Sequence, residues 1–243
     1  MTTLLKLEDL NVSFATPRGA LKAVRNVTIE LGAGESLGVV GESGSGKTVL
    51  SRATMGLLPS TATRTGAIVY QGEDISGWPS DKVRELWGVG MAMIFQDPMT
   101  ALNPVRRIGA QVTESLTVRL GMGKKAAKAR AIELLKRVRI PDPEGMLRKF
   151  PYQLSGGMRQ RIMIAIAVSC NPELLFADEP TTALDVTVQA QVLELLDELR
   201  KEYNTAMILV THDLGVVAGH PAKIAVDRKS TRLNSSHTVI SYA

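Results

Sequence analysis

The sequence predicts an α/β fold with a mixed-sheet core, an N-terminal antiparallel β subdomain and an inserted α-helical subdomain. Short apolar runs typical of buried strands alternate with segments of helical periodicity, and this alternation favours a parallel sheet. The N-terminal segment alternates polar and apolar side chains, as half-buried strands do. Residues from about 105 to 169 carry helical patterns and interrupt the series of strands.

Local patterns give the order of the expected elements. Two N-terminal strands, over 4–14 and 20–31, flank the turn Thr16-Pro17-Arg18-Gly19, because proline and glycine favour a change of chain direction. Apolar runs predict the later strands over 35–40, 66–71, 89–95, 174–178 and 206–210. Helices are expected over 47–55, from Ser80 to near Trp87, over 155–169 and over 186–203.

The inserted helical subdomain is predicted from the spacing of its apolar residues. Four of them fall at i, i+3, i+4 and i+7 and so share one helix face: Ala131, Leu134, Leu135 and Val138. Pro141 and Pro143 are expected to end that helix, because proline cannot continue it. We therefore expect one domain over residues 1–226, with the helical subdomain over about 105–169.

Bulk composition limits the possible function classes. The chain has 243 residues and a net charge of +5. Residues 227–243 contribute +2 of it, and the remaining charge of about +3 is too mild to indicate nucleic-acid binding. Its apolar runs are too short to span a bilayer, and Glu8 and Asp9 stand where a signal peptide would be apolar. The single cysteine, Cys170, cannot form an internal disulfide and is expected to be a small buried residue.

Basic residues gather between positions 119 and 139, where Glu133 is the one acidic side chain. Such a run most often forms a solvated helix face. Contact with anionic lipid or with a partner protein is the alternative.

The segment Gly41–Thr48 (GESGSGKT) has the pattern of a phosphate-binding loop, and it lies between a strand run and a helix, as the pattern requires. Glycines let successive backbone N–H groups face one concavity at the positive end of a helix, which binds anions. Lys47 would reach the β- and γ-phosphates of ATP, and the Thr48 hydroxyl would bind Mg²⁺. The residues expected to hold the nucleotide are Gly41, Glu42, Ser43, Gly44, Ser45, Gly46, Lys47 and Thr48.

Side chains that can bind a metal or take part in catalysis follow two further apolar runs, each of which is predicted to be a strand. Asp178 and Glu179 leave one apolar run together, and His212 follows another. Because ligands bind beyond the carboxyl ends of parallel strands, Gly41, Asp178 and His212 are expected to form one site. Asp178 would hold Mg²⁺ directly or through water, and Glu179 would orient and polarise the attacking water.

The run Leu154–Arg161 (LSGGMRQR) resembles the signature motif of the ATPase subunits of ABC transporters. It is specific here because the phosphate loop precedes it and Asp178-Glu179 follows it closely. Ser155, Gly156 and Gly157 present a hydroxyl and backbone N–H groups at a helix N-terminus, which makes a second anion site as well as a helix cap. One chain has one phosphate loop, so this second site is expected to face the γ-phosphate held by another subunit.

Other residues match motifs of the same family. Gln96 resembles the Q-loop glutamine, which implies that it completes the Mg²⁺ shell and couples the helical subdomain to the core. Asp185 resembles the aspartate of the D-loop, which crosses the dimer interface. His212 resembles the switch histidine that contacts the γ-phosphate, although a lone histidine at a strand end is often structural. Phe14 stands where an aromatic residue stacks on adenine, and it could equally belong to the core.

The resemblance narrows to the ATPase subunits of bacterial dipeptide, oligopeptide and nickel importers and covers about residues 4–226. It rests on the runs Met93–Pro104, Asp178–Gln191 and Thr211–Ala218. It implies two ATP·Mg²⁺ sites, each with Lys47, Thr48, Gln96, Asp178, Glu179 and His212 from one chain and Ser155, Gly157 and Asp185 from the other. It also implies a peripheral subunit on the cytoplasmic face of the bacterial inner membrane. Its partners would be an identical or different second ATPase, two membrane-spanning permeases and an external binding protein.

Residues 227–243 depart from the family pattern, and two other functions stay open. Family members continue the strand that ends at Val226 into a hairpin, whereas this polar tail resembles translated adapter sequence behind a truncated gene. A genuine disordered tail is the alternative. The chain could instead be an uncoupled fragment that binds nucleotide only. A soluble ABC ATPase without a role in transport is less compatible with the chain length, because such proteins usually carry two ATPase units or a long coiled coil.

Overall fold

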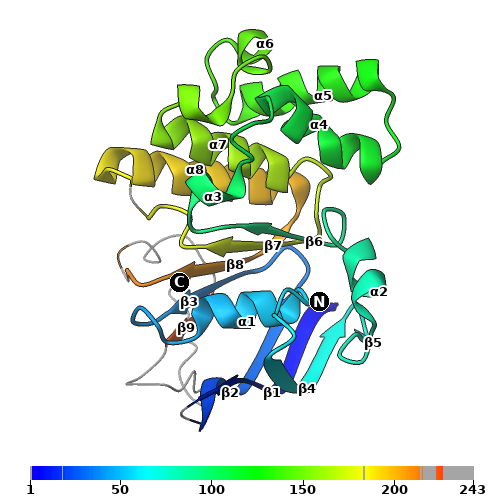
Figure 1. Cartoon of the computed structure of the whole chain (residues 1–243), viewed down its shortest axis with the longest axis vertical. Coiled ribbons are helices and arrows are strands. Elements are labelled where there is room, and N and C mark those ends of the chain that lie inside the picture. Colours follow the sequence, from blue (N-terminus) through cyan, green and yellow to red (C-terminus); the bar gives the residue numbers. More distant parts are fainter. Residues whose placement is uncertain (1, 18, 183, 214, 216–222, 227–243) are drawn as a thin grey trace. The chain divides into compact units, whose positions relative to one another are not determined.

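The computed structural model of the chain describes residues 2–17, 19–182, 184–213, 215 and 223–226 (Figure 1). The chain divides into two compact units. Unit 1 comprises Met1–Trp87 and Ala206–Ala243, and unit 2 comprises Gly88–Thr205. The expected tail over 227–243 lies outside the described residues.

Unit 1 contains a four-stranded antiparallel sheet in the order β2-β1-β4-β5. Its strands are β1 Thr3–Thr16, β2 Gly19–Gly32, β4 Ala62–Tyr70 and β5 Glu73–Asp74. The β1–β4 register shifts between Glu8 and Asn11, and Asp9 there has a φ of 46°. A Cβ at Gly66 would lie 2.4 Å from the Asp9 carbonyl oxygen, so glycine lets β4 approach this bulge. The predicted antiparallel N-terminal subdomain is therefore confirmed. Strand β4 includes most of the strand expected over 66–71, and β5 was not expected.

Unit 1 also contains a parallel ladder, in which β3 Ser36–Val40 lies between β8 Ala206–Thr211 and β9 Lys223–Val226. Every residue of β3 and β8 is buried, as strands covered on both faces require. Helix α1 Lys47–Thr54 follows β3 and contacts β1 and β2 (Figure 1). Helix α2 Ser80–Glu85 follows the antiparallel sheet.

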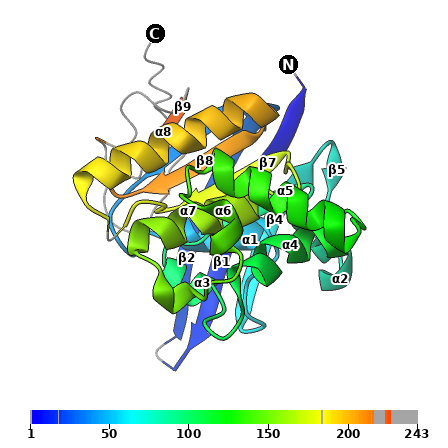
Figure 2. The same ribbon diagram turned by 90° about the horizontal axis from the view of Figure 1, so that it is seen from above.

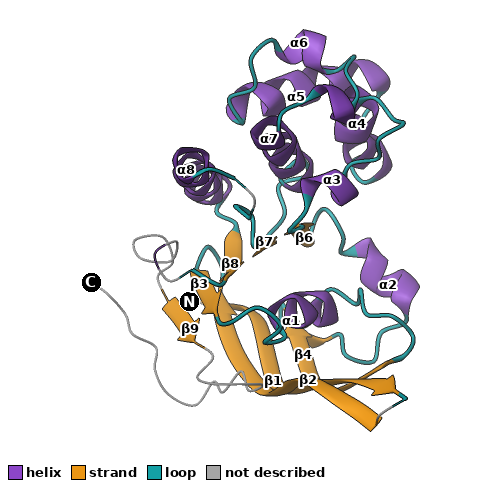
Figure 3. Cartoon of the chain, turned by 60° about the vertical axis from the view of Figure 1, so that its left-hand side comes forward, coloured by secondary structure: helices purple, strands orange, loops and turns teal. Residues whose placement is uncertain are grey.

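Unit 2 combines a parallel strand pair, β6 Met91–Ile94 with β7 Leu174–Asp178, and a group of helices. The helices are α3 Pro98–Ala101, α4 Ile108–Val118, α5 Lys124–Arg137, α6 Pro143–Met146, the 3-10 turn η1 Pro151–Gln153, α7 Gly156–Ala167 and α8 Val186–Tyr203. Helices α4, α5 and α7 lie side by side (Figures 2 and 3). The predicted stripe on α5 faces this group, because Ala131, Leu134, Leu135 and Val138 are all fully buried.

Two details of the helical region differ from the sequence-based expectation. Helical structure begins at Pro98, before residue 105, because the Asp97 side chain accepts a hydrogen bond from the Met99 N–H and caps α3. Pro143 does not end a helix. Helix α5 ends at Arg137, and Pro143 instead starts α6, where proline is favoured because the first helical N–H has no partner in the helix.

Two expectations drawn from the composition can also be compared with the structure. Cys170 is buried, and burial raises the pKa of its thiol. Within the described residues, no helix combines the length and the apolar composition needed to cross a membrane.

Candidate functional site

The loop between β3 and α1 is shaped to hold an anion. Gly46 is the N-cap of α1 in the left-handed region, and a Cβ there would lie 2.2 Å from the Ala23 carbonyl oxygen. Only glycine fits this position, and the N-cap residue therefore has no side chain with which to cap the helix. The positive end of α1 and its first N–H groups are thereby directed at the loop, as a phosphate requires.

Lys47 crosses this loop from the first position of α1. Its side chain is buried, with 4% exposed, and its ammonium donates to the carbonyl oxygens of Gly41 and Glu42, each at 2.8 Å. The Ser45 hydroxyl lies 3.5 Å from the same nitrogen. Lys47 therefore both places a positive charge at the loop and braces its backbone.

His212 and the start of the phosphate loop lie at the same end of the parallel ladder in unit 1. Val40 pairs with Thr211 in the β3–β8 register, and the Gly41 N–H donates to the Thr211 carbonyl oxygen at 3.4 Å. His212 follows directly and is exposed. The topology thus brings two of the three predicted strand-end residues together.

Asp178, Glu179 and Gln96 lie at the carboxyl end of the parallel strand pair β6–β7 in unit 2. Asp178 is the last residue of β7 and is 1% exposed, and Glu179 follows it with 9% exposed and a φ of 46°. Gln96 comes two residues after β6, and its Nε2 donates to Glu179 Oε2 at 2.9 Å. The Thr182 hydroxyl donates to the same oxygen at 3.0 Å. Gln96 and Glu179 therefore share one site within unit 2.

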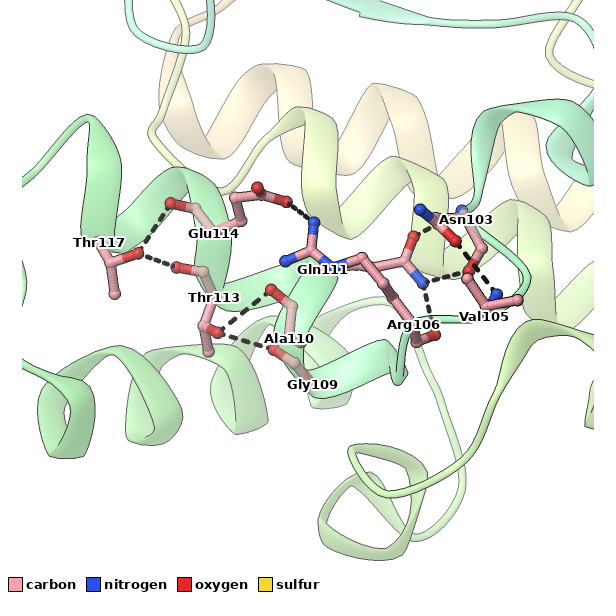
Figure 4. A network of polar contacts seen from close by, with 9 residues as sticks. All are labelled: Asn103, Val105, Arg106, Gly109, Ala110, Gln111, Thr113, Glu114 and Thr117. Carbon is pink, nitrogen blue, oxygen red and sulfur yellow. Dashed lines mark hydrogen bonds and ion pairs between the residues drawn. The ribbon is translucent and has the colours of Figure 1, made fainter.

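The segment between Gln96 and α4 is fixed by one buried amide (Figure 4). Gln111 on α4 is 8% exposed, and its Oε1 accepts a hydrogen bond from the Asn103 N–H at 2.9 Å. Its Nε2 donates to the carbonyl oxygens of Asn103 and Arg106, at 3.0 and 2.9 Å. Asn103 Oδ1 in turn accepts from the Val105 N–H at 3.1 Å. One side chain thus satisfies three backbone groups of the chain that follows Gln96.

Gln111→Glu should lower the free energy of unfolding. A carboxylate keeps the size of the amide but loses both donors, so the carbonyl oxygens of Asn103 and Arg106 would face a buried negative charge. Leaving one buried group unsatisfied costs about 1–3 kcal/mol, and here two are affected. The control is Glu114→Gln, which removes an exposed ion pair with Arg106 and should change stability by less than about 1 kcal/mol. Urea unfolding of both variants measures the difference, and equal midpoints would contradict this role of Gln111.

The glycine-rich start of α7 has the geometry predicted for the signature motif. Ser155 is the N-cap, and its Oγ accepts from the Met158 N–H at 3.4 Å. Ser155 and Gly156 are exposed. A Cβ at Gly157 would lie 3.2 Å from Val188 Cγ1, so glycine lets α7 approach the start of α8. The start of α7 is therefore exposed at Ser155 and Gly156, and the Ser155 hydroxyl is engaged as a cap.

Asp185 and Phe14, two further predicted site residues, also occupy positions within regular secondary structure or at its start. Asp185 is the N-cap of α8, where its Oδ1 accepts from the Val188 N–H at 3.0 Å. Phe14 lies in β1 between Leu21 of β2 and Ala62 of β4, and it is half-buried. Phe14 is therefore not a core residue, and its role toward adenine stays a prediction.

The residue types fit a nucleotide with Mg²⁺. Mg²⁺ prefers oxygen ligands, and the side chains of Thr48, Asp178 and Gln96 each carry oxygen. The phosphate loop and His212 belong to unit 1, whereas Gln96, Asp178, Glu179, Ser155 and Asp185 belong to unit 2. That all of them form one site stays a prediction.

Two contacts of the site were not anticipated from the sequence. Gln111 gives no signal in a local pattern, because its partners are backbone atoms of the preceding loop. Thr182 stands three residues after Glu179, and this spacing in a turn is the signal that could have indicated a contact.

Comparison with known proteins gives consistent matches. A family model described as "ABC transporter" matches residues 24–182. The oligopeptide transport ATP-binding protein OppD of Bacillus subtilis is 49% identical over 228 residues, which cover 93% of this chain and 64% of that protein. OppD of Salmonella typhimurium is 49% identical over 223 residues, which cover 92% of this chain and 67% of that protein. The chain thus spans about two thirds of the length of these relatives.

A solved structure has the same fold. The dimeric, post-hydrolysis state of the ATP-binding cassette MJ0796, bound to ADP and Pi, matches with a TM-score of 0.82 at 26% sequence identity. The match covers 92% of this chain and 94% of the other. The predicted ATPase-cassette fold is therefore confirmed.

Proposed function

Because the chain belongs to the ABC transporter family, we propose that it binds and hydrolyses ATP to power the uptake of short peptides into a bacterial cell. The observation that carries the proposal is the loop from Gly41 to Lys47. There a left-handed glycine at the N-cap of α1 and a buried lysine stand together in one glycine-rich loop. A phosphate bound there would face the positive end of the α1 dipole and the Lys47 ammonium.

The residues of unit 1 would bind and orient the triphosphate. Lys47 would donate to the β- and γ-phosphate oxygens from the side chain that now braces the loop carbonyls. His212 would contact the γ-phosphate from the neighbouring strand end. Thr48, Gln96 and Asp178 are the residues that would hold Mg²⁺, and the ion would supply positive charge to neutralise the phosphates.

Glu179 of unit 2 would accept a hydrogen bond from the attacking water and polarise it. Its carboxylate is held by donors from Gln96 and Thr182, so the side chain is positioned before any substrate arrives. Phosphoryl transfer depends mainly on positioning and on neutralising charge, so this arrangement supplies what the reaction needs from the protein.

A second ATPase subunit would complete each site. Ser155 and Gly157 at the start of α7, with Asp185 at the start of α8, would meet the γ-phosphate held by the other chain. Exposed residues at the N-terminus of a twelve-residue helix suit that contact, because a helix N-terminus favours anions. The dimeric state of the similar cassette bound to ADP and Pi supports the proposal.

Peptides are the proposed cargo because the similar proteins are oligopeptide transport ATP-binding proteins. Nickel import, which the sequence also suggested, has no support from these relatives. The chain would sit on the cytoplasmic face of the membrane, under two permease subunits that receive the peptide from an external binding protein.

The experiment is reconstitution with the permease pair and binding protein of the source organism in lipid vesicles, with a radiolabelled tripeptide as the probe. We expect tripeptide uptake that depends on ATP and is absent without this chain. Hydrolysis of ATP without association with the permeases would favour a soluble ATPase. Binding of ATP without hydrolysis would favour an uncoupled nucleotide-binding chain.

A further inference from the structure

We propose that Thr182 is a positioning residue that holds the Glu179 carboxylate in place for ATP hydrolysis. The inference rests on the proposed function, since it concerns the same site. It assigns a task to a side chain outside the predicted nucleotide and metal ligands.

Thr182 contacts Glu179 twice. Its hydroxyl donates to Glu179 Oε2 at 3.0 Å, and its backbone N–H donates to the Glu179 carbonyl oxygen at 3.2 Å. Gln96 Nε2 donates to the same carboxylate oxygen at 2.9 Å. Two donors from different segments therefore converge on one oxygen of the proposed catalytic carboxylate.

The turn that carries Thr182 is anchored on α8. Gln189, in the first turns of that helix, donates from Nε2 to the Thr181 carbonyl oxygen at 3.2 Å. Asp185 caps the same helix. The turn that carries Thr182 is thus tied to α8, whose N-cap Asp185 is the residue proposed to cross the subunit interface.

Glu179 needs such support because of its backbone. A φ of 46° is unfavourable for a residue with a side chain, and such conformations persist only when their surroundings hold them. The Thr182 N–H closes the turn, and its hydroxyl selects one orientation of the long glutamate side chain. Threonine hydroxyls in turns usually bond to nearby backbone. Here the hydroxyl is directed at a carboxylate that the mechanism uses.

The test compares three variants of the full chain by steady-state ATP hydrolysis. Thr182→Val removes the hydroxyl and keeps the branched shape, whereas Thr182→Ser keeps the hydroxyl. Thr113→Val removes a hydroxyl that donates to the Gly109 carbonyl oxygen within α4, away from these carboxylates. We expect kcat to fall by about ten- to a hundredfold in Thr182→Val, the span for one hydrogen bond to a charged group. Thr182→Ser, Thr113→Val and the KM for ATP should stay within about twofold of wild type.

A double variant separates positioning from general support of the fold. If Thr182 acts through Glu179, adding Thr182→Val to Glu179→Gln should change the residual single-turnover rate by less than about twofold. If Thr182 only supports the fold, the loss of rate caused by Thr182→Val would instead add in full to the loss caused by Glu179→Gln.

The outcomes distinguish the two proposals. Wild-type protein that does not hydrolyse ATP contradicts the proposed function and this inference together. Hydrolysis by wild type with an undiminished kcat in Thr182→Val overturns the inference alone. Equal losses in Thr182→Val and Thr182→Ser, or additive losses in the double variant, also overturn it.

Discussion

Lys47→Ala is expected to weaken ATP binding by about a hundredfold or more and to abolish turnover. The substitution removes a buried positive charge from the centre of the phosphate loop. It also removes the two hydrogen bonds that brace the carbonyl groups of Gly41 and Glu42. Truncating one partner of a buried, hydrogen-bonded charge pair costs about 2–5 kcal/mol, and 1.4 kcal/mol is a factor of ten in affinity.

Fluorescence titration with an ATP analogue measures the Kd of Lys47→Ala, and phosphate release measures its turnover. The control is Lys82→Ala in the same unit, because Lys82 is exposed and pairs with Glu73 outside the phosphate loop. That variant should bind ATP as wild type does. A wild-type Kd in Lys47→Ala would show that the loop is not the phosphate site.

Glu179→Gln is expected to separate binding from hydrolysis. The amide keeps the size of the side chain and leaves the phosphate loop of unit 1 unchanged, so the Kd for ATP should stay within about threefold of wild type. It cannot accept a proton or polarise water as a carboxylate does, and general-base groups contribute about 10²–10⁴-fold to rates. We therefore expect hydrolysis to fall by at least about a hundredfold.

Single-turnover hydrolysis of radiolabelled ATP, with protein in excess, measures this effect without the influence of product release. Glu133→Gln on α5 is the matched control, since its carboxylate is exposed and pairs with Arg130. It should hydrolyse ATP at the wild-type rate. If Glu179→Gln does so too, Glu179 has no catalytic role.

Sequence patterns predicted the elements that carry the site because local rules govern those elements. The strand β3, the glycine loop and α1 follow one another in the expected order, and the stripe from Ala131 to Val138 is buried as its spacing indicated. Gly46 was expected to serve backbone curvature, and the position does exclude a side chain. In each case the signal lies within one helix, one strand or the loop that joins them.

Other features were not predicted, because they depend on contacts or on turn geometry that a local pattern of residue types does not show. Gln111 serves backbone groups of the preceding loop, and nothing in its neighbours along α4 indicates this. Pro143 was assigned to a helix end because proline breaks helices, but it occupies the first position of α6, where its missing N–H has no cost. The contact from Thr182 depends on the turn that Glu179 begins in the left-handed region.

The most direct test of the central claim is phosphate release by the wild-type chain at saturating ATP and Mg²⁺, measured beside Lys47→Ala at equal protein concentration. We expect steady release by wild type, on the order of 1 per second or faster, as is typical of enzymes. We expect no release above background from Lys47→Ala. Wild-type protein that binds ATP and releases no phosphate, or equal release by both proteins, would contradict the proposal that this loop serves an ATPase.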